Sequence, residues 1–188
     1  MIVFGHVSAS LVQEFLERQT RAGFSYQEVG ATQDATRPAG YYLDSTRVTI
    51  GKGQEAFSRA RAAFRRWAMH SSPMLQLKPD GVKLEVGSSV CIQVGWGGIS
   101  LLNACQVVYV IDQPRSFGFG YGTLYDHPAR GEERFLLEHQ ENDDVVLSLF
   151  AFSKPSSWLY WLGLLVTRLM QAAFTRTYIQ NMKCAVLA

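Results

Sequence analysis

A run of about eighty residues, from Leu75 to Ser153, alternates apolar and polar side chains with a period of two. Such alternation predicts strands that have one apolar and one polar face, and the turns within the run predict antiparallel neighbours. A long helix with an apolar stripe is expected next, from about residue 156 to 182. Because the apolar face of a sheet must be covered, we expect an α+β fold in which an antiparallel sheet curves around this helix.

The turn residues divide the run into separate strands, and an earlier strand and helix precede them. Strands are expected at 82–86, 90–94, 103–111, 116–123, 132–140 and 145–153, after a strand at 41–50 and a helix at 54–70. The sheet would therefore have about seven strands. Residues 8–20 predict a further short helix, and a loop extends from there to residue 40. We expect one domain, 1–188, with residues 1–40 as an N-terminal appendage to a core at 41–188.

Composition excludes several classes of protein. With 47% hydrophobic residues and 18% charged residues in 188, the chain has enough apolar surface to bury a core. Its net charge of +2 is too small to predict binding to nucleic acid. Three scattered cysteines are typical of a reducing compartment, which predicts a cytoplasmic protein. Met1–Phe4 is too short, and lacks the basic flank, for a signal peptide.

The start of the terminal helix is the most apolar part of the chain. The apolar run Trp158–Val166 ends shortly before Arg168. It is therefore well short of the roughly twenty apolar residues that a membrane span requires. We therefore expect a buried amphipathic helix and no transmembrane segment. Peripheral contact with a membrane stays open, because the aromatic residues here could form a docking surface.

Aromatic residues and glycines alternate in the segment FGFGYG, which begins at Phe117. In a strand, Phe117, Phe119 and Tyr121 would share one face and leave the glycine face bare. Either the terminal helix or another backbone packs closely on that bare face, or the bare face is the floor of a ligand cavity.

The polar residues that follow suggest a site. Asp126 and His127 lie in a loop, and the paired Glu132 and Glu133 begin the next strand, so that only one of the two carboxylates can point inward. Glu133 shares its parity with Phe135, so we expect Glu133 to be the inward residue. On an apolar face it would require a partner, and Arg168, Arg47 and Tyr121 are the candidates. The alternatives are a network that locks the loop and a general acid–base pair of His127 and Glu133.

Metal and cofactor signatures are weak. The four histidines have no ligand spacing and no cysteine pair accompanies them, so we expect no metal. Gly51–Gly53 lacks the complete phosphate-binding pattern, and we expect no cofactor. The arginines between 59 and 66 are typical of a solvated helix face.

Two resemblances add to this interpretation. A curved sheet around a long helix is the helix-grip arrangement, and it resembles the superfamily of steroidogenic lipid-transfer proteins and birch-pollen allergens, whose members enclose an apolar cavity. In detail the chain is similar to an uncharacterised family of bacterial, cyanobacterial and plant proteins, domain of unknown function nineteen-ninety. The matching segments are YQEVGAT at 26–32, GYYLDSTRVTIGKG at 40–53, FSRARAAFRRW at 57–67, FGFGYGTLYDHPARGEERF at 117–135 and SKP at 153–155. For a plant protein, the resemblance implies the plastid stroma or envelope as an alternative location.

Three functional hypotheses follow from these observations. The first is a binding module for a small apolar or amphipathic molecule, held between the sheet and the terminal helix. The second is an enzyme that uses the same cavity for proton transfer on a lipid- or polyketide-like substrate, with His127 or Glu133 as its catalytic residue. The third is a protein-interaction domain whose cavity is filled by its own side chains. The expected ligand-binding residues are Trp67, Phe119, Tyr121, Thr123, His127, Glu133, Trp158 and Arg168.

Overall fold

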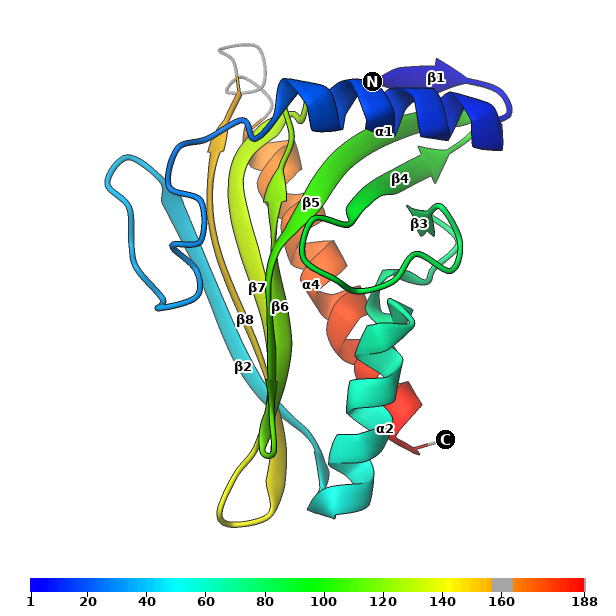
Figure 1. Cartoon of the computed structure of the whole chain (residues 1–188). Coiled ribbons are helices and arrows are strands. Elements are labelled where there is room, and N and C mark those ends of the chain that lie inside the picture. The colour runs from blue at the N-terminus through cyan, green and yellow to red at the C-terminus, as the bar shows by residue number, and fades with distance from the viewer. Residues whose placement is uncertain (157–163, 188) are drawn as a thin grey trace.

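The computed structural model describes residues 1–156 and 164–187, the side chains of 164–170 excepted. In this part of the chain an antiparallel sheet of eight strands curves around the C-terminal helix α4, and helix α2 packs beside α4 (Figure 1). The predicted α+β fold with a covering terminal helix is confirmed. The helical elements are α1 (Ala9–Ala22), α2 (Gly53–Arg65), the 3-10 turn η1 (Ala68–His70) and α4 (Leu164–Leu187). The strands are β1 (Ile2–Phe4), β2 (Tyr42–Lys52), β3 (Leu75–Lys78), β4 (Ser89–Trp96), β5 (Ile99–Gln113), β6 (Ser116–Thr123), β7 (Ala129–His139) and β8 (Asp144–Pro155).

The strand order places β7 and β8 inside the sheet, each with a paired strand on both sides. It runs β2-β8-β7-β6-β5-β4-β3, and β1 adds to β5. The register aligns Tyr121 of β6, Glu133 of β7, Ala151 of β8 and Asp44 of β2 in one row across four strands. Cross-strand partners point to the same face, so all four side chains belong to the concave face that α4 covers.

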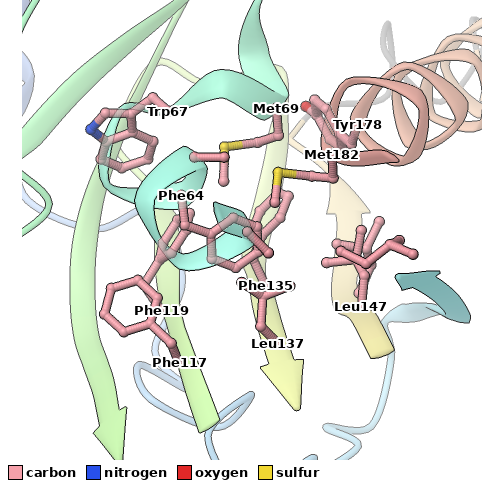
Figure 2. Close-up of a cluster of buried hydrophobic side chains, with 14 of the residues drawn as sticks. Phe64, Trp67, Met69, Phe117, Phe119, Phe135, Leu137, Leu147, Tyr178 and Met182 are labelled. Atoms are coloured by element: carbon pink, nitrogen blue, oxygen red, sulfur yellow. The ribbon is translucent and has the colours of Figure 1, made fainter. Parts of the chain in front are cut away.

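Aromatic and aliphatic side chains fill the space between the sheet and the two helices. The aromatic residues predicted to share one face of β6 point into this core, where Phe119 stacks on Phe135 at 5.1 Å between ring centroids. Phe64 of α2 meets both rings edge-on, and Met182 of α4 is fully buried beside them (Figure 2). Burial of such large side chains contributes about 1.5–3 kcal/mol each, so this cluster holds α2 and α4 on the sheet.

Helix α1 lies on the other side of the sheet, over β4 and β5 (Figure 1). Val12, Phe15 and Leu16 pack there against Leu102 and Leu124 in a second apolar cluster. Ser8 begins the helix, since its side chain accepts a hydrogen bond from the backbone N–H of Leu11 at 3.2 Å. The outward face of β5 is therefore apolar for the same reason as the inward one: a helix covers it.

Two expected elements differ in the structure. The strand expected at 82–86 is a loop, and β3 lies earlier, because Pro79 lacks a backbone donor and Gly81 and Gly87 turn the chain at positive φ. The helix expected at 54–70 ends at Arg65, because Trp67 adopts left-handed backbone geometry with φ 56°. The Trp67 indole N–H then donates to the carbonyl of Val82 at 3.0 Å, which ties this turn to the loop.

The glycine face of β6 is closely packed, so it is not the floor of a cavity. An added Cβ would lie 2.5 Å from the Tyr109 ring at Gly120 and 2.0 Å from the Tyr26 hydroxyl at Gly122. Close packing was one of the two expected alternatives, but the partners are two tyrosine side chains and not the terminal helix. Tyr26 belongs to the loop after α1. Because β6 has no side chain at Gly122, this loop can pack directly on the sheet.

We predict that Gly120→Ala destabilises the protein by about 1–3 kcal/mol, because the methyl group overlaps the Tyr109 ring. Gly95→Ala on β4 is the matched control, since its Cβ would meet its nearest neighbour at 3.4 Å. Urea unfolding of both variants measures the difference. Equal midpoints for the two variants would contradict this account of the glycine face.

Candidate functional site

Neighbouring carboxylates on β7 point to opposite faces of the sheet. Glu132 pairs with Gly122 and Glu133 with Tyr121 in the register with β6. Glu132 points outward beneath the loop that follows α1, and Glu133 points inward toward the helices, as expected from its parity with Phe135. The two side chains therefore have separate surroundings and separate roles.

The outward carboxylate has hydrogen-bond partners on both of its oxygens. Glu132 accepts hydrogen bonds from the Tyr26 hydroxyl at 2.6 Å and from the backbone N–H groups of Gly30 at 2.7 Å and Thr32 at 2.9 Å. The Thr32 hydroxyl donates to it as well. Charge-assisted hydrogen bonds of this kind are among the strongest in proteins. Glu132 thus clamps the loop onto the sheet, which is the locking role that sequence alone left open for this motif.

The inward carboxylate has a single described hydrogen-bond donor. The Tyr121 hydroxyl donates to Glu133 Oε2 at 2.9 Å. Burial raises the pKa of Glu133 to about 7; the Tyr121 hydrogen bond opposes this shift, and the nearby charge of Asp44 adds to it. Of the three partners expected for Glu133, Tyr121 is the one the structure supplies. Arg47 pairs instead with Glu138 at 3.1 Å, and the Arg168 side chain lies outside the described residues.

A buried histidine extends this contact into the core. His70 Nε2 lies 3.3 Å from the Tyr121 hydroxyl, and the rings of Trp67, Phe135 and Tyr178 surround the imidazole at centroid distances between 4.9 and 5.9 Å. Burial lowers the pKa of His70 to about 3, so the ring is neutral at physiological pH. Because the Tyr121 hydroxyl donates to Glu133, it accepts from His70 Nε2–H, and this fixes the tautomer. His70 Nδ1 is then a buried acceptor without a described partner.

Together these groups form a chain of hydrogen bonds from His70 through Tyr121 to Glu133. Only the carboxyl titrates near neutral pH, since burial also raises the pKa of Tyr121 well above its usual value. The arrangement can therefore hold or release one proton at Glu133 while the rest of the chain stays neutral. It can equally accept a hydrogen bond from a polar group of a bound molecule.

The concave face changes at this row from closed packing to accessible surface. Phe119 and Phe135, one row below, are 0% exposed, and Leu149 beside them is also buried. In contrast, Glu133 and Ala151 keep part of their surface accessible although they lie on central strands. Polar side chains dominate this upper end, where Gln171 of α4 reaches Ser153 of β8 at 3.4 Å. A molecule lying between sheet and helix would meet its polar surroundings here.

The predicted site residues are only partly brought together. Tyr121 and Glu133 are in contact, whereas Phe119 and Trp67 belong to the packed core and stack edge-on at 5.0 Å. The Trp158 side chain lies outside the described residues.

Thr123 and His127 serve the loop between β6 and β7. Thr123 Oγ1 bonds to the Ser25 hydroxyl at 2.6 Å and to the backbone of Gly131. His127 Nδ1 lies 2.9 Å from the carbonyl and 3.1 Å from the N–H of Ala129, and burial lowers its pKa to about 4. No described contact joins His127 to Glu133. The histidine that contacts Tyr121 is His70.

Sequence reasoning missed His70 and Tyr178. His70 ends a predicted helix just before Ser71-Ser72-Pro73, and no spacing links it to a tyrosine that lies 51 positions later. The one sequence feature that could have indicated His70 is that it is a lone ionisable residue at the end of an apolar helix face. Tyr178 lies on the buried side of α4. In the sequence it too is only a lone polar group on an apolar helix face.

An open groove lies on the other side of the molecule, between α1 and the turn after β3. Its volume is about 680 Å³, and Val12, Leu16 and Pro79 supply part of its apolar lining. The charges at its rim pair with each other, as in the Lys78–Asp80 contact at 3.2 Å. None of the residues of the Glu133 centre lines this groove. Within residues 1–156 and 164–187, no three His, Cys, Asp or Glu side chains gather as metal ligands would.

Comparison with known proteins identifies the family and the fold. A family described as "Domain of unknown function (DUF1990)" matches residues 12–181. Its relatives include a UPF0548 protein of Deinococcus radiodurans, 35% identical over 77% of this chain and 78% of that protein. Another, the UPF0548 protein At2g17695 of Arabidopsis thaliana, is 32% identical over 73% of this chain and 69% of that protein.

Solved structures share the fold at low identity. The hypothetical protein jhp0584 of Helicobacter pylori has a TM-score of 0.57 at 12% identity, over 77% of this chain and 86% of that one. Ara h 8.0201 has a TM-score of 0.52 at 8% identity, over 79% of this chain and 99% of that one. Norcoclaurine synthase of Thalictrum flavum has a TM-score of 0.53 at 9% identity, over 80% of this chain and 98% of that one. The expected helix-grip fold is confirmed.

We predict that Glu133→Gln stabilises the protein at pH 8 and has little effect near pH 4.5. The folded state binds the Glu133 proton more tightly than the unfolded chain, whose carboxyl titrates near 4.5. Stability should therefore fall as pH rises from about 4.5 to 7, by up to about 3 kcal/mol, and the amide removes this loss. Thermal unfolding across that pH range measures it.

Glu132→Gln is the matched control on the neighbouring residue. It removes a charge that four hydrogen-bond donors surround, so we expect it to destabilise the protein at neutral pH by about 2 kcal/mol or more. A loss of stability in Glu133→Gln at pH 8 would show that the Glu133 charge has a stabilising partner, and would contradict the raised pKa.

Proposed function

The chain belongs to the DUF1990 family, and we propose that it is a binding module that holds a small amphipathic molecule between the concave face of the sheet and α4. The observation that carries the proposal is Glu133, a partly exposed residue whose carboxyl has a raised pKa and a single described hydrogen-bond donor, at the row where the close packing of the concave face ends. Buried charges without close partners are costly, so such a group points to a ligand as its further partner.

The arrangement of the face defines the class of ligand. Glu133 Oε2 is taken by Tyr121, and the other carboxyl oxygen can accept a hydrogen bond from a hydroxyl or amine group of the ligand. The apolar part of the ligand would lie between Ala151 and α4, and its polar groups would face the polar upper end. Phe119 and Trp67 close the lower end of the site, because both side chains are buried and a ligand could not contact them without displacing the core.

A neighbour in fold supports this class of function. The norcoclaurine synthase structure is of a point mutant in complex with a transition-state analogue, so a small organic molecule is bound in one protein of this fold. At 9% identity this likeness extends to the fold alone. It supports the proposal that a protein of this fold can hold a ligand.

Proton transfer is the second candidate, and the pKa of Glu133 is the observation that favours it. A carboxyl with a pKa of about 7 is suited to act as acid or base at neutral pH, and Tyr121 connects it to His70. This candidate uses the same ligand site. It would require that the bound molecule leaves chemically changed.

We predict that a long-chain alcohol such as decanol raises the melting temperature of the protein, and that Glu133→Leu abolishes this effect. The alcohol supplies an apolar chain and one hydroxyl donor, the two features that the site requires. Differential scanning fluorimetry measures the shift, and native mass spectrometry shows whether a molecule co-purifies with the protein.

Glu138→Gln is the control for this experiment, since Glu138 lies on the same strand and pairs with Arg47 on the outer face. Equal shifts in all three proteins would mean that the alcohol binds elsewhere, and would refute the site. Recovery of a chemically altered molecule from the wild type, but not from Glu133→Gln, would favour catalysis over binding.

A further inference from the structure

Strand β1 and the ends of β4 and β5 beside it, at the upper right of Figure 1, are the part of the sheet considered next, and they carry four exposed apolar side chains. They are Ile2 at 62%, Phe4 at 78%, Ile99 at 49% and Trp96 at 82% exposed. The register places Phe4, Ile99 and Trp96 in one row across β1, β5 and β4, and Ile2 lies two residues from Phe4 on the same face. These four residues are called the apolar tip below.

The apolar tip continues the concave face at its rim. Ile99, Leu101, Asn103 and Cys105 are every second residue of β5 and share one face, and Cys105 belongs to the core between sheet and helices. Here, however, the row projects beyond the core, and most of its surface is exposed. Large exposed apolar patches are uncommon in monomeric proteins and mark surfaces that bind something.

Charged residues are absent from the two segments that build the tip. Residues 1–13 and 86–111 contain no Asp, Glu, Lys or Arg, although the chain as a whole has 34 of them. An acidic or basic partner would therefore find no complementary charge, and an anionic surface would gain nothing by electrostatics. The apolar tip consists of one tryptophan, one phenylalanine and two isoleucines, beside the Gly97-Gly98 turn that joins β4 and β5.

The size of the tip argues against a second copy of the chain. Four side chains of this type, at these exposed fractions, present on the order of 500 Å². A stable interface buries about 800 Å² on each partner. The free edge of β1 adds little, because that strand is three residues long.

We propose that the apolar tip inserts into the interfacial region of a lipid bilayer. Tryptophan and phenylalanine side chains are suited to that region, where an apolar ring lies below the headgroups. Because the tip has no charge, binding would not require anionic lipids. Among the described residues no helix is long and apolar enough to span a membrane, so this contact would be peripheral. The proposal does not depend on a ligand at Glu133.

Sedimentation with phosphatidylcholine vesicles tests this proposal on the full chain. We expect the wild type to sediment with the vesicles, and about 0.5 M NaCl to leave the bound fraction unchanged. The double substitution Phe4→Ser and Trp96→Ser should lower the partition coefficient at least about tenfold. Its melting temperature should match the wild type, because both side chains are exposed.

Tyr125→Ser is the matched control, since Tyr125 is an aromatic residue of similar exposure, 64%, in the loop after β6. It should bind vesicles as the wild type does. The proposal is overturned if the wild type stays in the supernatant, if the double variant sediments equally well, or if salt releases the protein. A dimer in analytical ultracentrifugation that the double substitution dissociates, without vesicle binding, would identify a second copy as the partner instead.

Discussion

The alternation of side chains along β7 is the constraint on which the rest of the structure depends. Because successive residues of a strand point to opposite faces, Glu132 and Glu133 cannot share surroundings. One carboxylate meets backbone donors of a surface loop and is fully satisfied. The other meets the apolar interior and a single phenol. A shift of β7 by one residue would turn Glu133 outward and Glu132 inward. The loop after α1 would then lose the clamp, and the inward carboxylate would lose its hydrogen bond with Tyr121.

The clamp also explains how the loop after α1 is held on the sheet. Tyr26 fits against Gly122 because that position has no side chain, and its hydroxyl then reaches Glu132. Tyr109 fits against Gly120 in the same way and bonds to Thr32 at 2.7 Å. The glycines on one face of β6 and the aromatic residues on the other are therefore two halves of one arrangement. Each face packs against a different part of the chain.

Local pattern was sufficient to predict the fold but only part of the site. Strand alternation identifies the inward position of Glu133, and parity with Phe135 is a purely local rule. The same rules could not find β3, which is four residues long and ends at a proline, or the interruption of the helix at Trp67. His70 was missed because its contact with Tyr121 depends on how that turn packs over the sheet. The described contacts of His127 are with Ala129 of its own loop, a detail that its place in the sequence could not predict.

The position of Glu133 is informative because burial disfavours its charged form in the folded protein. Its row neighbours on the concave face include Ala151, and the row below is closed by Phe135 and Leu149. An apolar residue at 133 would continue that packing and avoid the unfavourable transfer of a carboxyl into the interior. Proteins keep groups that oppose stability mainly where binding or chemistry uses them. The loop clamp accounts for Glu132 in structural terms, and no comparable structural account covers Glu133. That asymmetry between adjacent residues is the argument for a site on the concave face.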